Sequence, residues 1–189
     1  MKNRSLNLKT SKLLIDSNVI ILGYMGCGKS LIAKSLANIL NLKCIDLDCL
    51  IEIREKMKIS EIFQTKGELE FRKIEKEILL NVLKSSKKTV ISLGGGTPCY
   101  FENMNVINSN SKYVFYIKNS NKILSKRLLK ERKNRPIISK IESLEHMMEF
   151  VSKHIFERTH FYNMAKYKID AGKKKIEEIT NEIIEILNQ

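Results

Sequence analysis

One short stretch near the amino terminus constrains the fold of this chain more than any other. An apolar run at residues 18–23 (NVIILG) leads into GYMGCGKS at 23–30, and an amphipathic helical pattern follows from Lys29 to Leu40. An apolar run without alternation is typical of a strand buried on both faces. The spacing G-x-x-x-x-G-K-[ST] between a strand and a helix predicts a loop whose main-chain N–H groups surround phosphates. The stretch therefore predicts an α/β domain with a nucleotide site.

The rest of the chain repeats the alternation of strand and helix. Strand-like runs occur at 43–46, 88–93, 113–117 and 166–170, and helical patterns fill 60–84, 123–129, 141–164 and 174–187. This order predicts a parallel sheet covered by helices on both faces. Ligands of such sheets bind outside the carboxyl ends of the strands, where the turns after Leu22, Ile45 and Leu93 are expected. We expect one domain over 18–189 and a flexible basic arm over 1–17, with an organellar presequence as the alternative for the arm.

Composition narrows the partners. The chain has 189 residues, 34 Lys+Arg against 21 Asp+Glu and a formal charge of +13. Lysine predominates and is scattered, which favours a solvated surface over a nucleic-acid site, and the apolar runs are too short for a membrane span. The positive charge would attract small anions. The cysteines form no C-x-x-C pair, so we expect no zinc site and reduced thiols in a cytoplasm: Cys27, Cys44, Cys49 and Cys99.

The residues of the loop have separable tasks. Gly26 and Gly28 let the main chain wrap the phosphates, and Lys29 is expected to reach the β- and γ-phosphates of ATP. The hydroxyl of Ser30 is expected to bind Mg²⁺. Cys27 is either a small filler or a thiol activated by the helix amino terminus. A loop of this type does not by itself choose among ATPases, GTPases and small-molecule kinases, although no guanine-reading N-K-x-D is present.

An ordered set of motifs resembles the shikimate kinase family. Over about residues 18–187 the set consists of GYMGCGKS, IDLD at 45–48, EIFQTKGELEFRKIE at 61–75, LGGGTP at 93–98, NRP at 134–136 and ERTHFY at 157–162. The resemblance implies a P-loop NTPase-like, three-layer fold with a five-stranded parallel sheet. It also implies a substrate-binding segment near 48–80 and a mobile lid near 130–140. The implied activity is transfer of the ATP γ-phosphoryl group to the 3-hydroxyl of shikimate, in chorismate and aromatic amino-acid biosynthesis.

The resemblance also assigns the acceptor side. Asp48 matches the carboxylate that binds shikimate and accepts the hydroxyl proton, and Asp46 matches an acid near Mg²⁺; a helix N-cap is the alternative for either. Arg72 and Arg158 match the pair that grips the substrate carboxylate, for which a planar guanidinium is suited. The alternative for Arg72 is a surface ion pair with Glu68. Three glycines are expected to approach the ring with their main chain: Gly94, Gly95 and Gly96.

Arginines further along match the lid. Arg135 corresponds to the lid arginine that neutralises charge on the transferring phosphoryl group, as a third catalytic residue beside Lys29 and Asp48. An upstream arginine should stack on adenine; Arg127 is our choice and Arg132 the alternative. Leu31, at the edge of the nucleotide site, stands where the family often has threonine. His160 and Phe161, shortly after Arg158, are a second departure from the pattern of the family.

Two other functions remain as alternatives. One is a kinase for another polyol acid such as gluconate, against which the two arginines and the glycine triplet argue. The other is a catalytically silent relative that binds nucleotide, which would be expected to have lost Lys29, Ser30, Asp48 or Arg135. All four are present. We expect a monomer whose partners are shikimate and ATP, with no nucleic acid and no membrane.

Overall fold

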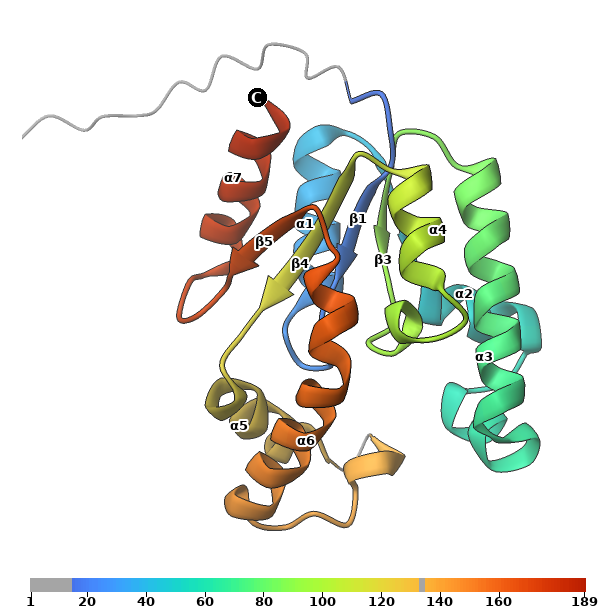
Figure 1. Cartoon of the computed structure of the whole chain (residues 1–189), viewed down its shortest axis with the longest axis vertical. Helices are drawn as coiled ribbons and strands as arrows, with labels where there is room; N and C mark the ends of the chain where they lie inside the picture. Colours follow the sequence, from blue (N-terminus) through green and yellow to red (C-terminus); the bar gives the residue numbers. More distant parts are fainter. Residues whose placement is uncertain (1–14, 133–134) are drawn as a thin grey trace, which may run out of the picture.

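The computed structural model describes residues 15–132 and 135–189 and contains one five-stranded sheet (Figure 1). All the strand pairs are parallel, and the order across the sheet is β2-β3-β1-β4-β5. The predicted five-stranded parallel sheet is thus confirmed. The strands are β1 (Val19–Leu22), β2 (Lys43–Asp46), β3 (Thr89–Ser92), β4 (Tyr113–Lys118) and β5 (Tyr167–Asp170).

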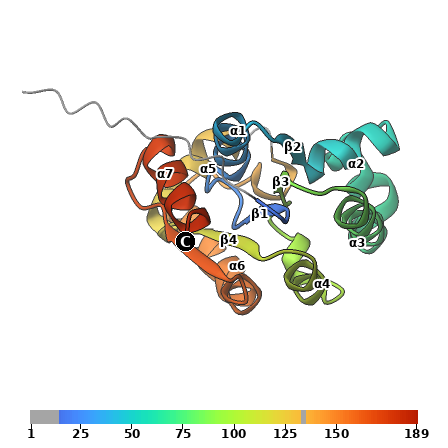
Figure 2. The ribbon, with the colours of Figure 1, turned by 90° about the horizontal axis from the view of Figure 1, so that it is seen from above.

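Helices cover the two faces of this sheet, as the alternating pattern predicts. Viewed from above, α1 and α7 lie on one face and α4 and α6 on the other, with α3 beside α4 (Figure 2). The α-helices are α1 (Lys29–Leu40), α2 (Leu47–Glu55), α3 (Ile59–Ser85), α4 (Asn103–Asn110), α5 (Asn121–Glu131), α6 (Leu144–Asn163) and α7 (Ile176–Leu187). Within residues 15–132 and 135–189, short 3-10 turns include η1 (Thr97–Cys99) and η3 (Pro136–Ile138).

The centre of the core is β1, the middle strand of the sheet. All four of its residues are fully buried, because β3 and β4 pair with it on either side and helices close both faces. The apolar run that opens the domain therefore has the environment that its lack of alternation predicts. A strand that is buried and paired on both sides fixes the point from which the following loop starts.

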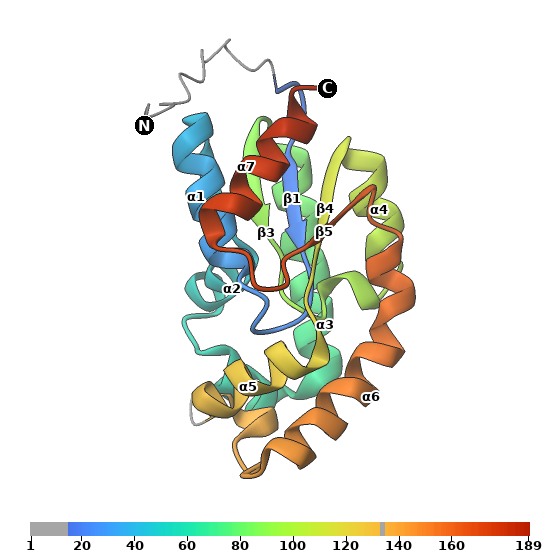
Figure 3. The same cartoon turned by 90° about the vertical axis from the view of Figure 1, so that its left-hand side faces the viewer.

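Three of the strands deliver their following loops to the same edge of the sheet. Ile21 of β1 and Asp46 of β2 both pair in register with Ser92 of β3, and the main-chain N–H of Leu93 donates to the carbonyl of Ile21 (3.0 Å). The loop between β1 and α1 turns at this end, with α5 close by (Figure 3). The site residues predicted after β1, β2 and β3 consequently meet at one edge.

Some boundaries differ from the expectations. Ile15 is buried in the core and Lys112 pairs with Asp16 (2.6 Å), so residues 15–17 pack on the domain; residues 1–14 of the arm lie outside the described residues. Residues 133–134 of the expected lid lie outside them as well. Among the described residues, none of the helices combines the length and apolarity that crossing a lipid bilayer requires.

Candidate active site

The loop after β1 has the main-chain form that its glycines predict. Gly26 and Gly28 adopt positive φ angles of 78° and 98°, and Gly28 forms the N-cap of α1 without a capping side chain. The first turn of α1 therefore keeps N–H groups that can donate to an anion. Lys29 is largely buried, and its Nζ donates to the carbonyl oxygen of Tyr24 (3.1 Å) within the same loop.

The hydroxyl of Ser30 reaches the end of β2. Its Oγ donates to Oδ2 of Asp46 (2.7 Å), while Oδ1 of Asp46 accepts the main-chain N–H groups of Asp48 (3.1 Å) and Cys49 (3.4 Å). Asp46 is thus the N-cap of α2, and Asp48 lies in the first turn of that helix rather than at its cap. Ser30 and Asp46 together present the oxygen donors that Mg²⁺ prefers.

Asp48 is a carboxyl with an unusual environment. Burial raises its pKa to about 6, and the nearby carboxylates of Asp46 and Glu75 add to the increase, while Lys29 and Arg72 oppose it. A carboxyl with this pKa is largely ionised at neutral pH and is a stronger base than an exposed aspartate. Asp48 is therefore a carboxylate that can accept a proton, within electrostatic range of the lysine of the loop and the arginine of α3.

The glycine triplet follows β3 and packs tightly against these groups. A Cβ on Gly94 would lie 2.6 Å from Oδ1 of Asp48, and a Cβ on Gly96 would lie 2.5 Å from Nη2 of Arg72. No side chain fits at either position without displacing a charged group. The carbonyl of Gly95 accepts the hydroxyl of Tyr162 (2.6 Å), which holds the middle of the triplet in place.

Arg72 is buried rather than on the surface. Its Nη1 pairs with Oε2 of Glu75 (2.8 Å) and its Nη2 with Oε1 of Glu68 (3.1 Å), so the alternative ion pair with Glu68 exists, although within a cleft. Arg158 faces the same cleft from α6, and its guanidinium carbon lies 5.9 Å from the centre of the Tyr24 ring. The two arginines that were predicted as a pair thus meet at one opening.

Two adjacent clefts contain these residues. The first, about 530 Å³, is lined by loop residues 25–31, Asp46, Asp48, Gly95, Arg127 and Arg135, among others. The second, about 400 Å³, is lined by Glu68, Arg72, Tyr100, His154 and Arg158, together with Phe63, Cys99, Ile137, Glu157 and Phe161. Gly95 lines the first cleft, and Gly96 backs the arginine of the second. The main chain of the triplet therefore separates the two.

The three arginines near the expected lid have different positions. Nη1 of Arg127 donates to the carbonyl of Gly26 (3.1 Å), and Nη2 of Arg135 pairs with Glu131 (3.0 Å); both arginines line the first cleft. Arg132 instead donates to the carbonyl of Leu129 (3.2 Å) and is absent from that lining. This arrangement favours Arg127 over Arg132 as the arginine expected to stack on adenine. Leu31 and Cys27 also line the first cleft.

Sequence reasoning missed the aromatic groups at and beside the second cleft. The hydroxyl of Tyr24 lies 3.2 Å from Nδ1 of His154. The pKa of this histidine is lowered, mainly by burial and next by the charge of Arg158. Tyr100 packs its ring on the guanidinium of Arg72 at 4.3 Å. Aromatic residues make up only 7% of the chain, so Tyr24 inside the loop and Tyr100 beside the triplet were available signals.

Comparison with known proteins gives a consistent answer. The family model described as shikimate kinase matches residues 25–188. A shikimate kinase of Flavobacterium johnsoniae is 41% identical over 169 residues, which span 89% of this chain and 98% of the relative. The crystal structure of shikimate kinase from Bacteroides thetaiotaomicron has a TM-score of 0.84 at 32% identity, covering 92% of this chain and 99% of that one. A gluconokinase from Sinorhizobium meliloti, at 12% identity and a TM-score of 0.51, covers 92% of each chain and shares the fold alone.

Proposed function

The chain belongs to the shikimate kinase family, and from that premise we propose how its own residues transfer the γ-phosphoryl group of ATP to the 3-hydroxyl of shikimate. One observation carries the proposal: a phosphate-binding cleft and a two-arginine cleft adjoin at the glycine triplet, with Asp48 lining the first. A triphosphate in one and a small carboxylic acid in the other would bring their reacting groups together at Asp48. The product is shikimate 3-phosphate, an intermediate on the route to chorismate.

The nucleotide occupies the first cleft. The N–H groups of the loop and of the α1 amino terminus bind phosphate oxygens, and Lys29 exchanges its hydrogen bond to the Tyr24 carbonyl for one to the β- and γ-phosphates. Arg127 borders the base and Arg135 the transferring group. The oxygens of Ser30 and Asp46 would hold Mg²⁺, which when bound offsets negative charge on the phosphates.

Shikimate occupies the second cleft with its carboxylate toward Arg72 and Arg158. A guanidinium binds a carboxylate through two parallel N–H groups, which fixes the orientation of the ring. The glycine triplet has no side chains to hold the ring away, so its main chain can contact the hydroxyl groups. This orientation directs the 3-hydroxyl toward Asp48 and the first cleft.

The transfer step is then a single displacement. Asp48 accepts the proton of the 3-hydroxyl as that oxygen bonds to the γ-phosphorus, and the bond from the same phosphorus to the bridging oxygen of ADP breaks. Arg135 and Lys29 stabilise the charge on the phosphoryl oxygens during transfer. A pKa of about 6 leaves Asp48 ionised and basic at neutral pH.

The cysteines and the linings of the clefts bear on the cellular compartment and the oligomeric state. All four cysteines are free thiols, which suits a reducing cytoplasm. The described residues of one chain line both clefts, so we propose that a monomer is sufficient for activity.

The test is acceptor-dependent release of ADP. With Mg²⁺ and ATP, shikimate should give rapid ADP release and a single phosphomonoester at the 3-position, read by ³¹P and ¹H NMR. With gluconate, the rate of ADP release should not exceed the rate without an added acceptor. The Asp48→Asn variant is the matched control and should bind ATP without turnover. Turnover of gluconate but not shikimate would establish the alternative kinase, and nucleotide binding without turnover of either acid would establish a silent relative.

A further inference from the structure

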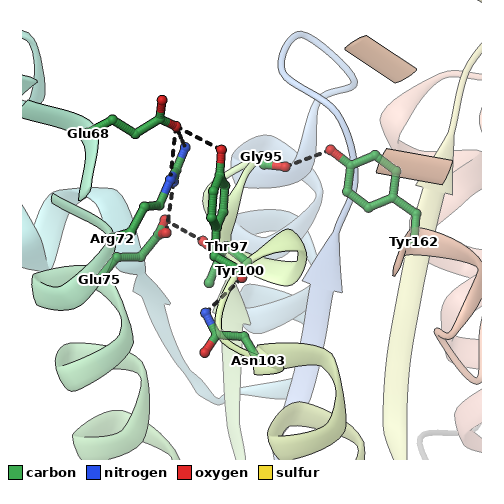
Figure 4. Close-up of polar contacts among 8 residues, drawn as sticks. All are labelled: Glu68, Arg72, Glu75, Gly95, Thr97, Tyr100, Asn103 and Tyr162. Carbon is green, nitrogen blue, oxygen red and sulfur yellow. Dashed lines mark hydrogen bonds and ion pairs between the residues drawn. The ribbon is translucent and has the colours of Figure 1, made fainter. Parts of the chain in front are cut away.

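A carboxylate of the protein itself already lies where the substrate carboxylate is expected. Oε1 of Glu68 accepts hydrogen bonds from Nε (3.3 Å) and Nη2 (3.1 Å) of Arg72, as Figure 4 shows. These two donors form one edge of the guanidinium, the edge that a carboxylate binds with two parallel hydrogen bonds. Glu68 also lines the cleft that contains Arg158.

The other partner of Arg72 is of a different kind. Glu75 is only 1% exposed, pairs with Nη1 of Arg72 (2.8 Å) and accepts the hydroxyl of Thr97 on its Oε1 (2.7 Å). It is fixed on both sides and is needed to balance a buried cation. The side chain of Glu68, in contrast, is 53% exposed. Glu68 is therefore partly hydrated, and Glu75 still balances the charge of Arg72 without it, so this carboxylate can be exchanged for another.

Aromatic rings and the glycine triplet pack closely around the guanidinium. The centre of the Tyr100 ring lies 4.3 Å from the guanidinium carbon, and the centre of the Phe71 ring lies 5.0 Å from it. Gly96 packs against the Nη atoms. With Nη1 held by Glu75, the edge occupied by Glu68 is the edge that remains for a ligand.

Glu68 has a second hydrogen-bond donor in this position. The hydroxyl of Tyr100 donates to the same Oε1 (2.8 Å). Burial acts to raise the pKa of Glu68, but the hydrogen bonds from Tyr100 and Arg72 and the charge of Arg158 bring it below its ordinary value, so the group is an anion at neutral pH. Glu68 directly follows Gly67, whose φ of 78° and ψ of 170° interrupt α3 and begin its second segment.

We propose that Glu68 is an internal competitor of the substrate: it occupies the carboxylate position on Arg72 in the empty enzyme and must be displaced when shikimate binds. The inference rests on the proposed function and adds a residue that sets substrate affinity. Only a fraction of the empty enzyme has a free Arg72 edge, and the apparent affinity is reduced by that fraction. The same factor applies to any carboxylate that binds this edge, and shikimate offsets it through the added contacts of its ring hydroxyls.

The experiment compares two variants of α3, each of which replaces one glutamate by glutamine and so removes one negative charge. Glu68→Gln keeps the shape of the side chain and removes the competing charge. We expect the calorimetric Kd and the KM for shikimate to fall by about two- to fivefold, with kcat and the KM for ATP unchanged. Glu70→Gln is the matched control, because Glu70 pairs with Lys73 (3.1 Å) and lies outside the lining of the cleft; its constants should equal those of the parent enzyme.

A double-mutant cycle tests the part of Tyr100. Tyr100→Phe keeps the ring on Arg72 and removes the hydrogen bond to Glu68, so it should lower the KM for shikimate, and the Glu68→Gln/Tyr100→Phe double variant should match Glu68→Gln. Unchanged or weaker binding of shikimate by Glu68→Gln, or additive effects in the cycle, would overturn the inference. If the parent enzyme neither binds nor phosphorylates shikimate, the proposed function itself fails, which is a separate outcome.

Discussion

Asp48 is the residue that we expect to set the pH dependence of kcat. Its pKa is about 6, raised first by burial and then by Asp46 and Glu75. Only the ionised form can accept the hydroxyl proton, so kcat should be level above pH 7 and fall about tenfold per unit below pH 6. The measurement is kcat at saturating substrates from pH 5 to 8, with activity re-measured at pH 7.5 after each incubation to exclude unfolding. Equal kcat at pH 5 and 7.5 would contradict the role.

The same shift predicts a gain in stability when the charge is removed. The folded state binds the Asp48 proton more tightly than the unfolded state, whose pKa is near 3.8, so this group costs stability as pH rises through about 6. Asp48→Asn should therefore raise the free energy of unfolding by about 1–3 kcal/mol at pH 7.5 and by much less at pH 4. Urea denaturation at both pH values measures this, and a variant less stable than the parent at pH 7.5 would show that the carboxylate is well compensated.

Arg72 gives a third prediction at this scale. Lysine in its place keeps a charge but cannot form two parallel hydrogen bonds to a carboxylate, and it leaves Glu75 less well paired. Arg72→Lys should raise the KM for shikimate by about ten- to a hundredfold and change the KM for ATP by less than about twofold. Steady-state kinetics with each substrate varied in turn gives both constants; equal increases would contradict the assignment.

At the scale of elements, the strands and most helices could be predicted because their patterns match their environments. The predicted ranges for α1 and β2 agree with the structure. The helix α4 was missed, since NMNVINSN is rich in residues of low helix propensity; its helix depends on packing of Met104 and Ile107 in the core. Residues 60–84 were predicted as helical without the interruption at Gly67, and the apolar Leu69 just after it is 66% exposed.

This interruption of α3 predicts a specific cost of substitution. At φ 78° and ψ 170° Gly67 occupies a region that residues with a Cβ avoid, although a Cβ there would meet no atom within 4 Å. Gly67→Ala should thus destabilise the fold by about 1–3 kcal/mol through main-chain strain alone. Urea denaturation should give a lower midpoint with an unchanged m-value, while Gln64→Ala, at an exposed helical position nearby, should be neutral. Equal midpoints would mean that α3 can straighten without penalty.

At the scale of the molecule, the meeting of the two clefts could be predicted because the loops after β1, β2 and β3 share one edge of a parallel sheet. The partners of the site residues could not be predicted in the same way. Helical spacing brings Glu68 near Arg72, but whether the pair is exposed or in a cleft depends on Tyr100 and Arg158, which are distant in sequence. Contacts of that kind are set by tertiary packing.

Net charge is a property of the whole chain and gives the last prediction. The charged residues that line the clefts are nearly balanced in sign, whereas the chain carries +13, so attraction of anionic substrates at long range comes from the rest of the molecule. Raising the ionic strength from about 0.01 to 0.15 M shortens the Debye length from about 30 to 8 Å. We expect kcat/KM for shikimate to fall by about three- to tenfold while kcat stays within about twofold, because screening weakens encounter and not the transfer step. Potassium chloride and potassium acetate should give the same curve. A dependence on the identity of the anion would assign the effect to ions bound in the clefts. If kcat/KM does not depend on ionic strength, long-range attraction is ruled out.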